Sequence, residues 1–132
     1  MIVLDASAAA AVLLNLGARA PHIRKRMAES DGDLHMPHLF EIEVLSVLRR
    51  YFLRGELSPQ RARLALHRLS TMRFTRYPHT ALIFRVWELR DNVTPYDAAY
   101  IALAETLKAP LITTDARLAQ APGKRAAIEV YR

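Results

Sequence analysis

The amino-acid sequence predicts an α/β fold of three layers, in which a central, mainly parallel sheet is covered by helices on both faces. Short apolar runs alternate along the chain with longer segments whose apolar residues recur at helical spacing, and this alternation is typical of parallel strands and their crossover helices. Of the 132 residues, 52% are hydrophobic and 24% are charged, which is a globular balance. We therefore expect residues 1–132 to form a single domain with one core.

The first third of the chain is expected to form a strand, two helices and a second strand. Met1–Leu4 is short, apolar and rich in branched side chains, which indicates a buried strand. Helical spacing follows over 6–16 and 19–29, and Gly17 is expected to end the first of these helices. Leu34–Pro37 is a weaker strand candidate.

The middle of the chain predicts two amphipathic helices. The first covers Leu39–Arg54 and is expected to end at Gly55. The second covers Pro59–Met72, with Ser58 as its N-cap and proline at its first helical position. Phe74–Tyr77 then has the pattern of an extended segment.

The last third predicts helices over Thr80–Asp91 and Thr94–Lys108, then a buried strand at Leu111–Thr113. A short helix over 115–120 and a final strand, Ile128–Tyr131, complete the chain. In a parallel sheet of this kind, ligands bind beyond the carboxyl ends of the strands, at the point where the strand order reverses.

Composition excludes several classes of protein. The chain has no cysteine, which excludes disulfide scaffolds, thiolate catalysis and cysteine-ligated zinc and is compatible with the cytoplasm. No glycine cluster is present to bind a nucleotide phosphate. The longest apolar run, Ala8–Leu14, is far shorter than the roughly 20 residues of a membrane span, and Asp5 precedes every basic residue, unlike in a signal peptide. We expect a cytoplasmic protein without a membrane partner.

The charge is strongly basic and carried mostly by arginine. The formal net charge is +6, and only three of the 19 basic residues are lysines. Arginine suits phosphate binding, so an anionic partner is one interpretation, and a compositional bias on an ordinary solvated surface is the other. Between Arg49 and Arg76 there are eight arginines and a single acid, Glu56, which is the pattern either of an RNA-binding surface or of solvated helix faces.

Two aspartates are expected at the same edge of the sheet, and a third lies at the start of a helix. Asp5 and Asp115 each follow a predicted strand and precede a helix, and Asp97 lies in the first turn of another helix. Each also fits a structural role, because Asp5 and Asp115 can be N-caps and Thr94 with Asp97 has the spacing of a capping box.

Glu43 cannot be explained by capping, since it lies inside the helix predicted over Leu39–Arg54. Its neighbours at helical spacing are mostly apolar, so its side chain is expected to face inward. The alternative to a functional role is an ion pair, for example with Arg50 or Arg54.

Bringing four carboxylates together is unfavourable, because like charges and desolvation both disfavour ionisation. A hard divalent cation reverses this, since Mg²⁺ or Mn²⁺ prefers carboxylate oxygen and completes its shell with water and phosphate. Such a cation can activate a water molecule and stabilise a leaving oxygen. An acidic cluster in a basic protein therefore points to metal-dependent hydrolysis of a phosphodiester.

The sequence also resembles the PIN-domain ribonucleases, and specifically the VapC-type toxins of toxin–antitoxin pairs. Four segments spread over almost the whole chain carry the resemblance. They are Met1–Ser7, Pro37–Arg49 with the pattern Glu-Val-x-x-Val-Leu-Arg, Tyr96–Glu105 with Tyr-Asp-Ala-Ala-Tyr, and Pro110–Leu118 with Thr-Thr-Asp.

The resemblance implies an endoribonuclease of PIN-like fold in which a metal-activated water attacks an RNA phosphodiester. It implies that the metal, Mg²⁺ or alternatively Mn²⁺, is held by Asp5, Glu43, Asp97 and Asp115. Ser7 and Thr113 match small hydroxyl residues beside the acids, and the pattern selects Glu43 rather than Glu41. A mild departure is Ser46, where many relatives carry asparagine.

The same resemblance implies a cognate VapB-type antitoxin and a homodimer, and the antitoxin is a third possible partner of the arginines between Arg49 and Arg76. A PIN-domain RNA-processing nuclease without an antitoxin, or an inactive PIN-like RNA- or protein-binding module, remains the alternative. A phosphoacceptor receiver domain is disfavoured, because Asp5 has no paired acid and no lysine ends a strand.

The remaining candidates favour structural roles. The five histidines, at positions 22, 35, 38, 67 and 79, lack the spacing of a zinc site and are interpreted as surface or packing residues. Trp87, together with Phe84, Val86 and Leu89, is expected to pack in the core or against another subunit rather than to stack on bases.

Overall fold

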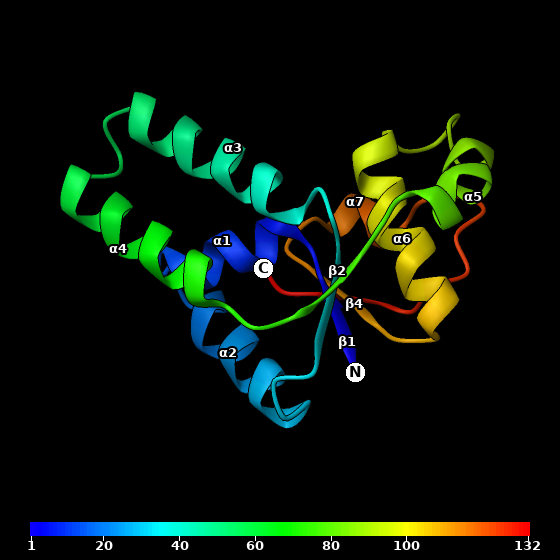
Figure 1. Ribbon diagram of the computed structural model, residues 1–132, viewed down its shortest axis with the longest axis horizontal. Coiled ribbons are helices and arrows are strands. Elements are labelled where there is room, and N and C mark those ends of the chain that lie inside the picture. The colour runs from blue at the N-terminus through cyan, green and yellow to red at the C-terminus, as the bar shows by residue number, and fades with distance from the viewer.

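The computed structural model describes residues 1–132 and contains a five-stranded, all-parallel sheet of order β3-β2-β1-β4-β5 (Figure 1). The strands are β1 (Ile2–Leu4), β2 (Leu34–Pro37), β3 (Thr75–Tyr77), β4 (Leu111–Thr113) and β5 (Ile128–Val130). The α-helices are α1 (Ala6–Leu13), α2 (Arg19–Glu29), α3 (Phe40–Leu53), α4 (Pro59–Thr71), α5 (Ile83–Glu88), α6 (Pro95–Leu107) and α7 (Ala116–Ala119). The predicted α/β class with a parallel sheet is confirmed.

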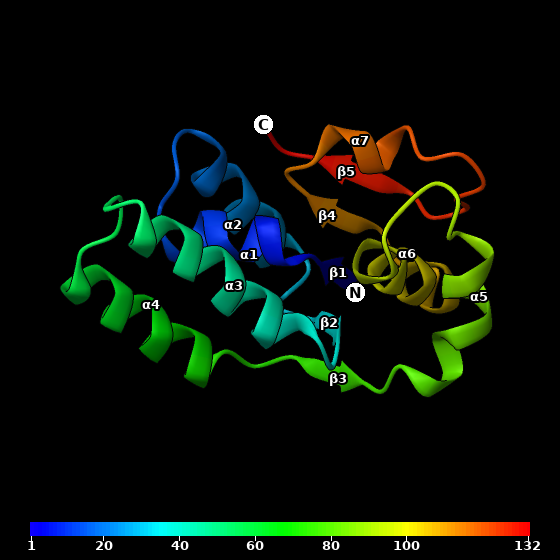
Figure 2. The same ribbon diagram turned by 90° about the horizontal axis from the view of Figure 1, so that it is seen from above.

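Helices cover both faces of the sheet, as Figure 2 shows. Helices α1 to α4 lie on one side, where α1 packs against α2 and α3, and α5 and α6 lie on the other, with α6 against β1 and β2. The three predicted layers are therefore present. No helix of the protein is both long enough and apolar enough to cross a membrane.

The strand order reverses between β1 and β4, which is the place where parallel sheets bind ligands. From β1 the chain continues through β2 to β3 on one side, and it then returns to place β4 on the other side of β1. Leu4 and Ile112 are register partners in β1 and β4. The residues that follow these two strands, Asp5 and Thr114, are consequently neighbours in space although they are far apart in the sequence.

The core lies between the sheet and its two helical layers. The strands β1, β2 and β4 are buried along their whole length, as parallel strands covered on both faces should be. Alanines such as Ala8 and Ala9 let α1 pack tightly, and the stretch Ala98–Ala104 of α6 is buried at every position. This packing fixes the starts of α1 and α6, which carry Asp5 and Asp97.

Two helix ends differ from the predicted ones. Helix α1 ends at Leu13 instead of at residue 16, because Asn15 adopts a left-handed conformation with φ of 55° and reverses the chain before Gly17 is reached. Gly17 therefore does not directly follow the helix. Gly55, in contrast, follows the cap residue Arg54 of α3 with φ of 75°, as predicted.

The predicted helix over residues 80–91 is shorter than expected and splits in two. A 3₁₀ turn covers Thr80–Leu82, and α5 then ends at Glu88. Of the two predicted alternatives, core packing is excluded for Phe84 and Trp87, which are 85% and 65% exposed, and packing against another subunit stays a prediction; Leu89 is buried. Arg90 stacks on the Trp87 ring at 4.8 Å from its centroid.

Candidate active site

Asp5 is buried at the point where the strand order reverses. It follows β1, caps the N-terminus of α1 and is only 5% exposed. Its Oδ1 accepts hydrogen bonds from Ser7 Oγ at 2.7 Å and from the Ala8 amide at 2.9 Å, and its Oδ2 accepts one from Thr113 Oγ1. The capping role is therefore real, but it does not exclude a second role, because the side chain also lines a cavity.

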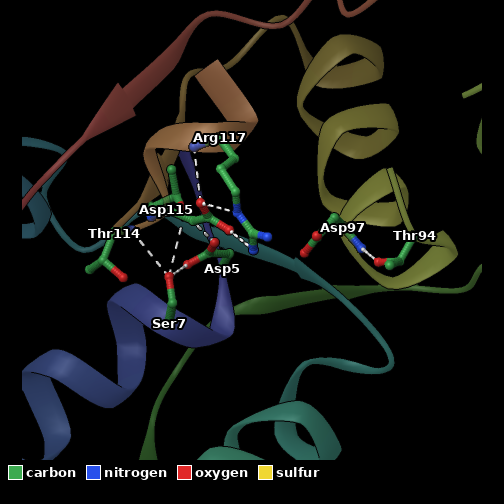
Figure 3. Close-up of polar contacts among 8 residues, drawn as sticks. Asp5, Ser7, Thr94, Asp97, Thr114, Asp115 and Arg117 are labelled. Carbon is green, nitrogen blue, oxygen red and sulfur yellow. Dashed lines mark hydrogen bonds and ion pairs between the residues drawn. The ribbon is translucent and has the colours of Figure 1, made fainter. Parts of the chain in front are cut away.

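The two hydroxyl residues join the ends of β1 and β4. Ser7 Oγ accepts a hydrogen bond from the Thr114 amide at 3.1 Å (Figure 3). Thr113 Oγ1 accepts one from the Asp115 amide at 3.0 Å. Both hydroxyls donate to Asp5, and each accepts a hydrogen bond from a backbone amide of the residues that follow β4. The network holds the backbone of Asp115 close to Asp5.

Glu43 projects from α3 into the same cavity without an ionic partner. Neither Arg50 nor Arg54 forms an ion pair with it, so the predicted structural alternative is wrong. Partial burial raises the pKa of the Glu43 carboxyl, the nearby Tyr100 hydroxyl lowers it, and the negative charges of Asp97 and Asp5 raise it further. No hydrogen bond of ordinary geometry joins the Tyr100 hydroxyl to Glu43. By contrast, Glu41 is paired with Arg76 at 2.7 Å.

Asp97 and Asp115 approach the cavity from the starts of α6 and α7. The capping-box prediction is confirmed for Thr94, whose Oγ1 accepts a hydrogen bond from the Asp97 amide at 3.2 Å. The Asp97 carboxylate itself points toward the site in Figure 3 and has no ion pair. Asp115 caps α7 and is held by Arg117, whose Nη2 lies 2.8 Å from Asp115 Oδ2.

The four predicted acids all line one cavity of about 470 Å³. The other polar side chains of its wall belong to Ser7, Ser46, Arg50, Tyr96 and Tyr100. No three of the acids are as close together as the ligands of a single ion. Binding of one ion by these acids therefore requires side chains to move closer together, and neither Glu43 nor Asp97 is held by an ion pair.

Burial and like charge raise the pKa values of three of the four acids in the cavity. Burial raises the pKa of Asp5 and of Asp97, and the neighbouring carboxylates Asp97 and Asp115 respectively add to this effect. Only Asp115 has a lowered pKa, because the Arg117 guanidinium donates hydrogen bonds to it. An oxygen-rich donor set with unfavourable like charges matches the chemistry of a hard divalent cation.

Replacing Arg117 by alanine is expected to strengthen divalent-cation binding. The Arg117 side chain is exposed, so its loss should leave the free energy of unfolding nearly unchanged. It would remove the guanidinium hydrogen bonds to both oxygens of Asp115, leaving only the backbone amide of residue 117 on Oδ1, and it would remove a positive charge from the site. In thermal unfolding with increasing Mn²⁺, the variant should reach half-saturation at a lower Mn²⁺ concentration than wild type. A higher concentration would contradict this interpretation. Arg125→Ala is the control, because the Arg125 guanidinium lies outside the cavity and forms no ion pair.

Sequence reasoning missed several residues of the cavity. The pair of Asp115 with Arg117 has a local signal, because a residue two positions beyond an N-cap can reach it. Tyr100 also has one, since it lies three residues after Asp97 on the same helix face. The positions of Arg50 and Tyr96 depend on how α3 and α6 pack around the site, and no local pattern reveals that.

The other candidates lie outside the cavity. No histidine lines it, and His35 is instead bonded to Tyr77 and Asp33, which confirms the packing interpretation for that residue. In the basic segment, Arg61 donates to the Leu14 carbonyl and Arg76 to Glu41, so part of its charge is used within the fold.

Comparison with known proteins agrees with this geometry. The PIN domain family model matches residues 2–124. Ribonuclease VapC1 of Mycobacterium tuberculosis is 45% identical over 98% of this chain and 97% of its own, and VapC9 of the same species is 45% identical over 89% and 88%. The crystal structure of M. tuberculosis VapC20, described as a sarcin-ricin loop cleaving toxin, covers 100% of both chains with a TM-score of 0.71 and 21% identity. The chain therefore belongs to the PIN-domain family and, within it, to the VapC ribonucleases of VapBC toxin–antitoxin systems.

Proposed function

We propose that Asp5, Glu43, Asp97 and Asp115 hold a divalent cation, Mg²⁺ or Mn²⁺, with which this ribonuclease cuts RNA internally. The observation that carries the proposal is that four acids from four separate segments line one cavity at the strand-order reversal. Three of them have raised pKa values and therefore gain from a bound cation. In an inactive binding module, nothing would compensate for the unfavourable repulsion among these carboxylates.

The protein's own residues would orient the cation and the RNA. Asp5 is held in one orientation by three donors, so that it needs no reorganisation to act as a ligand. Arg50 lines the cavity two turns after Glu43 and has no ion pair, which leaves its guanidinium available to an RNA phosphate. When bound, the cation supplies a water of lowered pKa and stabilises negative charge on the phosphate.

The two glutamates of α3 provide a matched test. Glu43→Gln is expected to lower the rate of RNA cleavage in Mg²⁺ by about 10- to 100-fold, because it removes one charged ligand and keeps the shape of the side chain. Glu41→Gln changes the same chemical group two residues away, outside the cavity, and should cut RNA at the wild-type rate. The measurement is cleavage of a labelled RNA by purified protein, with EDTA as the metal-free reference. Equal activity of the two variants would contradict the proposed site.

A VapBC system implies an RNA substrate and a VapB antitoxin. We further propose that the active form is a cytoplasmic homodimer of single-domain chains, supported by the exposed apolar side chains Phe84 and Trp87. Sedimentation of the wild type and of Trp87→Ala tests the dimer, because a monomeric wild type would contradict it. Rescue of growth by the gene that adjoins this one would distinguish a toxin from an RNA-processing nuclease without an antitoxin.

A further inference from the structure

Tyr100 combines complete burial with an unused hydroxyl. The residue lies on α6, one turn beyond Asp97, and is 1% exposed. Its Oη is one of only two buried side-chain polar atoms in the protein that have no hydrogen-bond partner. Because buried polar groups are normally paired, an orphaned hydroxyl calls for a physical explanation.

Packing alone does not explain the hydroxyl. Tyr100 belongs to the hydrophobic core, where its ring contributes the buried area. A phenylalanine would fill the same space without burying a polar atom, and an unpaired polar atom destabilises the fold. The hydroxyl therefore adds nothing to the packing of the core that a phenylalanine ring would not supply.

The hydroxyl is located at the wall of the acidic cavity. Tyr100 and Glu43 both line this cavity, and each acts on the other electrostatically. A tyrosine hydroxyl is protonated at neutral pH, since its ordinary pKa is about 10, and it can therefore donate to a carboxylate. The arrangement places an unpaired donor beside an acid that has no ion pair.

Glu43 needs such a donor more than Asp5 or Asp115 does. Asp5 is held by Ser7, Ala8 and Thr113, and Asp115 is held by Arg117. Glu43 has a longer side chain and no comparable support. Ligating carboxylates are usually hydrogen-bonded by neighbouring groups that fix their orientation, and this is the role that is unfilled for Glu43.

We propose that Tyr100 is a positioning residue whose hydroxyl donates a hydrogen bond to the Glu43 carboxylate when a divalent cation occupies the cavity. One oxygen of Glu43 is then held by Tyr100 while the other faces the cation. The inference rests on the proposed function, because it assumes that Glu43 is a ligand. It adds that the donor for this ligand comes from α6, so that α3 and α6 are coupled through the site.

The test is Tyr100→Phe, which should weaken metal binding and activity without lowering the stability of the metal-free protein. In the absence of metal the variant should unfold at the same temperature as wild type or at a higher one, because an unpaired buried hydroxyl is removed. Its half-saturation for Mn²⁺, followed by thermal unfolding, should weaken about 10-fold, and kcat for RNA cleavage should fall about 10- to 100-fold with KM unchanged. A purely structural hydroxyl would instead lower the metal-free unfolding temperature and leave Mn²⁺ binding as it is.

Tyr77→Phe is the matched control. Its hydroxyl is bonded to His35 at 2.7 Å, outside the cavity. This variant should unfold at a lower temperature than wild type and keep its Mn²⁺ affinity, which is the reverse of the result expected for Tyr100→Phe. A Tyr100→Phe protein that does not fold, or that binds Mn²⁺ like wild type, overturns the inference.

The double variant Tyr100→Phe/Glu43→Gln shows whether Tyr100 acts through Glu43. If it does, adding Tyr100→Phe to Glu43→Gln should weaken Mn²⁺ binding by less than twofold beyond the single change. Fully additive effects would overturn the inference. Failure of the proposed function has a different signature, because Asp5→Asn and Glu43→Gln would then also bind Mn²⁺ and cut RNA like wild type.

Discussion

Asp5→Asn is expected to lower RNA cleavage by about 10²–10³-fold or more while raising the stability of the metal-free protein at neutral pH. The loss of activity follows from removing a charged ligand that three donors hold in place. The gain in stability follows from removing a buried charge, whose burial and proximity to Asp97 raise the pKa of Asp5.

The fold should tolerate this change. The asparagine oxygen can still accept from the Ala8 amide and cap α1, and the Thr113 hydroxyl can turn to accept from the new amide group. Chemical denaturation would measure stability and RNA cleavage would measure activity. Asp33→Asn is the control, because Asp33 is exposed and pairs with the N-terminal amine and His35 outside the cavity.

The pH dependence gives the Asp5→Asn comparison a definite sign. A carboxyl whose pKa is higher in the folded state contributes stability below its ordinary value near 4, and this contribution is lost as pH rises through the raised pKa. The variant should therefore exceed wild type in stability at pH 7, and the difference should shrink as pH falls toward 4. A variant that cuts RNA normally, or that is less stable than wild type only at neutral pH, would refute the assignment of Asp5.

Saturating divalent cation is expected to stabilise wild-type protein by about 2.7 kcal/mol when its concentration is a hundred times the dissociation constant. The cation binds the folded state because only folding brings Asp5, Glu43, Asp97 and Asp115 into one cavity. It also relieves the repulsion that raises three of their pKa values. Thermal unfolding in Mg²⁺ and in Mn²⁺, each against EDTA, measures the effect.

This stabilisation should depend on pH in a predictable direction. The carboxyls with raised pKa values must lose their protons before they bind a cation, so the metal-induced shift should be larger at pH 7.5 than at pH 5. Asp97→Asn, which removes one of the repelling charges, should raise the metal-free stability at pH 7.5 and reduce the shift. An unfolding temperature that does not change in millimolar Mg²⁺ or Mn²⁺ at either pH value would refute a metal site.

Much of the fold could be predicted because its signals are local. Buried parallel strands such as Leu111–Thr113 are continuous apolar runs, and the caps Ser58 and Thr94 are recognisable side chains. The early end of α1 was missed because it depends on a left-handed Asn15, which the sequence pattern does not require. The exposure of Trp87 was missed because a six-residue helix is too short for periodicity to define its buried face.

In the candidate site, too, some features could be predicted from local sequence signals and others could not. The convergence of Asp5 and Asp115 could be predicted, because the carboxyl ends of parallel strands share an edge. That Glu43 has no ion pair and that the Tyr100 hydroxyl has no partner could not, since both depend on how α3 and α6 approach the cavity from opposite sides of the sheet. Helical spacing places a side chain on a face, but it does not identify what another helix brings to that face.

The return of the chain to place β4 beside β1 has a consequence for biosynthesis. During translation Asp5 leaves the ribosome first, and its β4 neighbour Thr113 is added 108 residues later. Long-range pairing of this kind completes late in folding. A nascent or prematurely terminated chain that lacks β4 therefore also lacks Thr113 and Asp115, and it cannot form the complete acidic cavity.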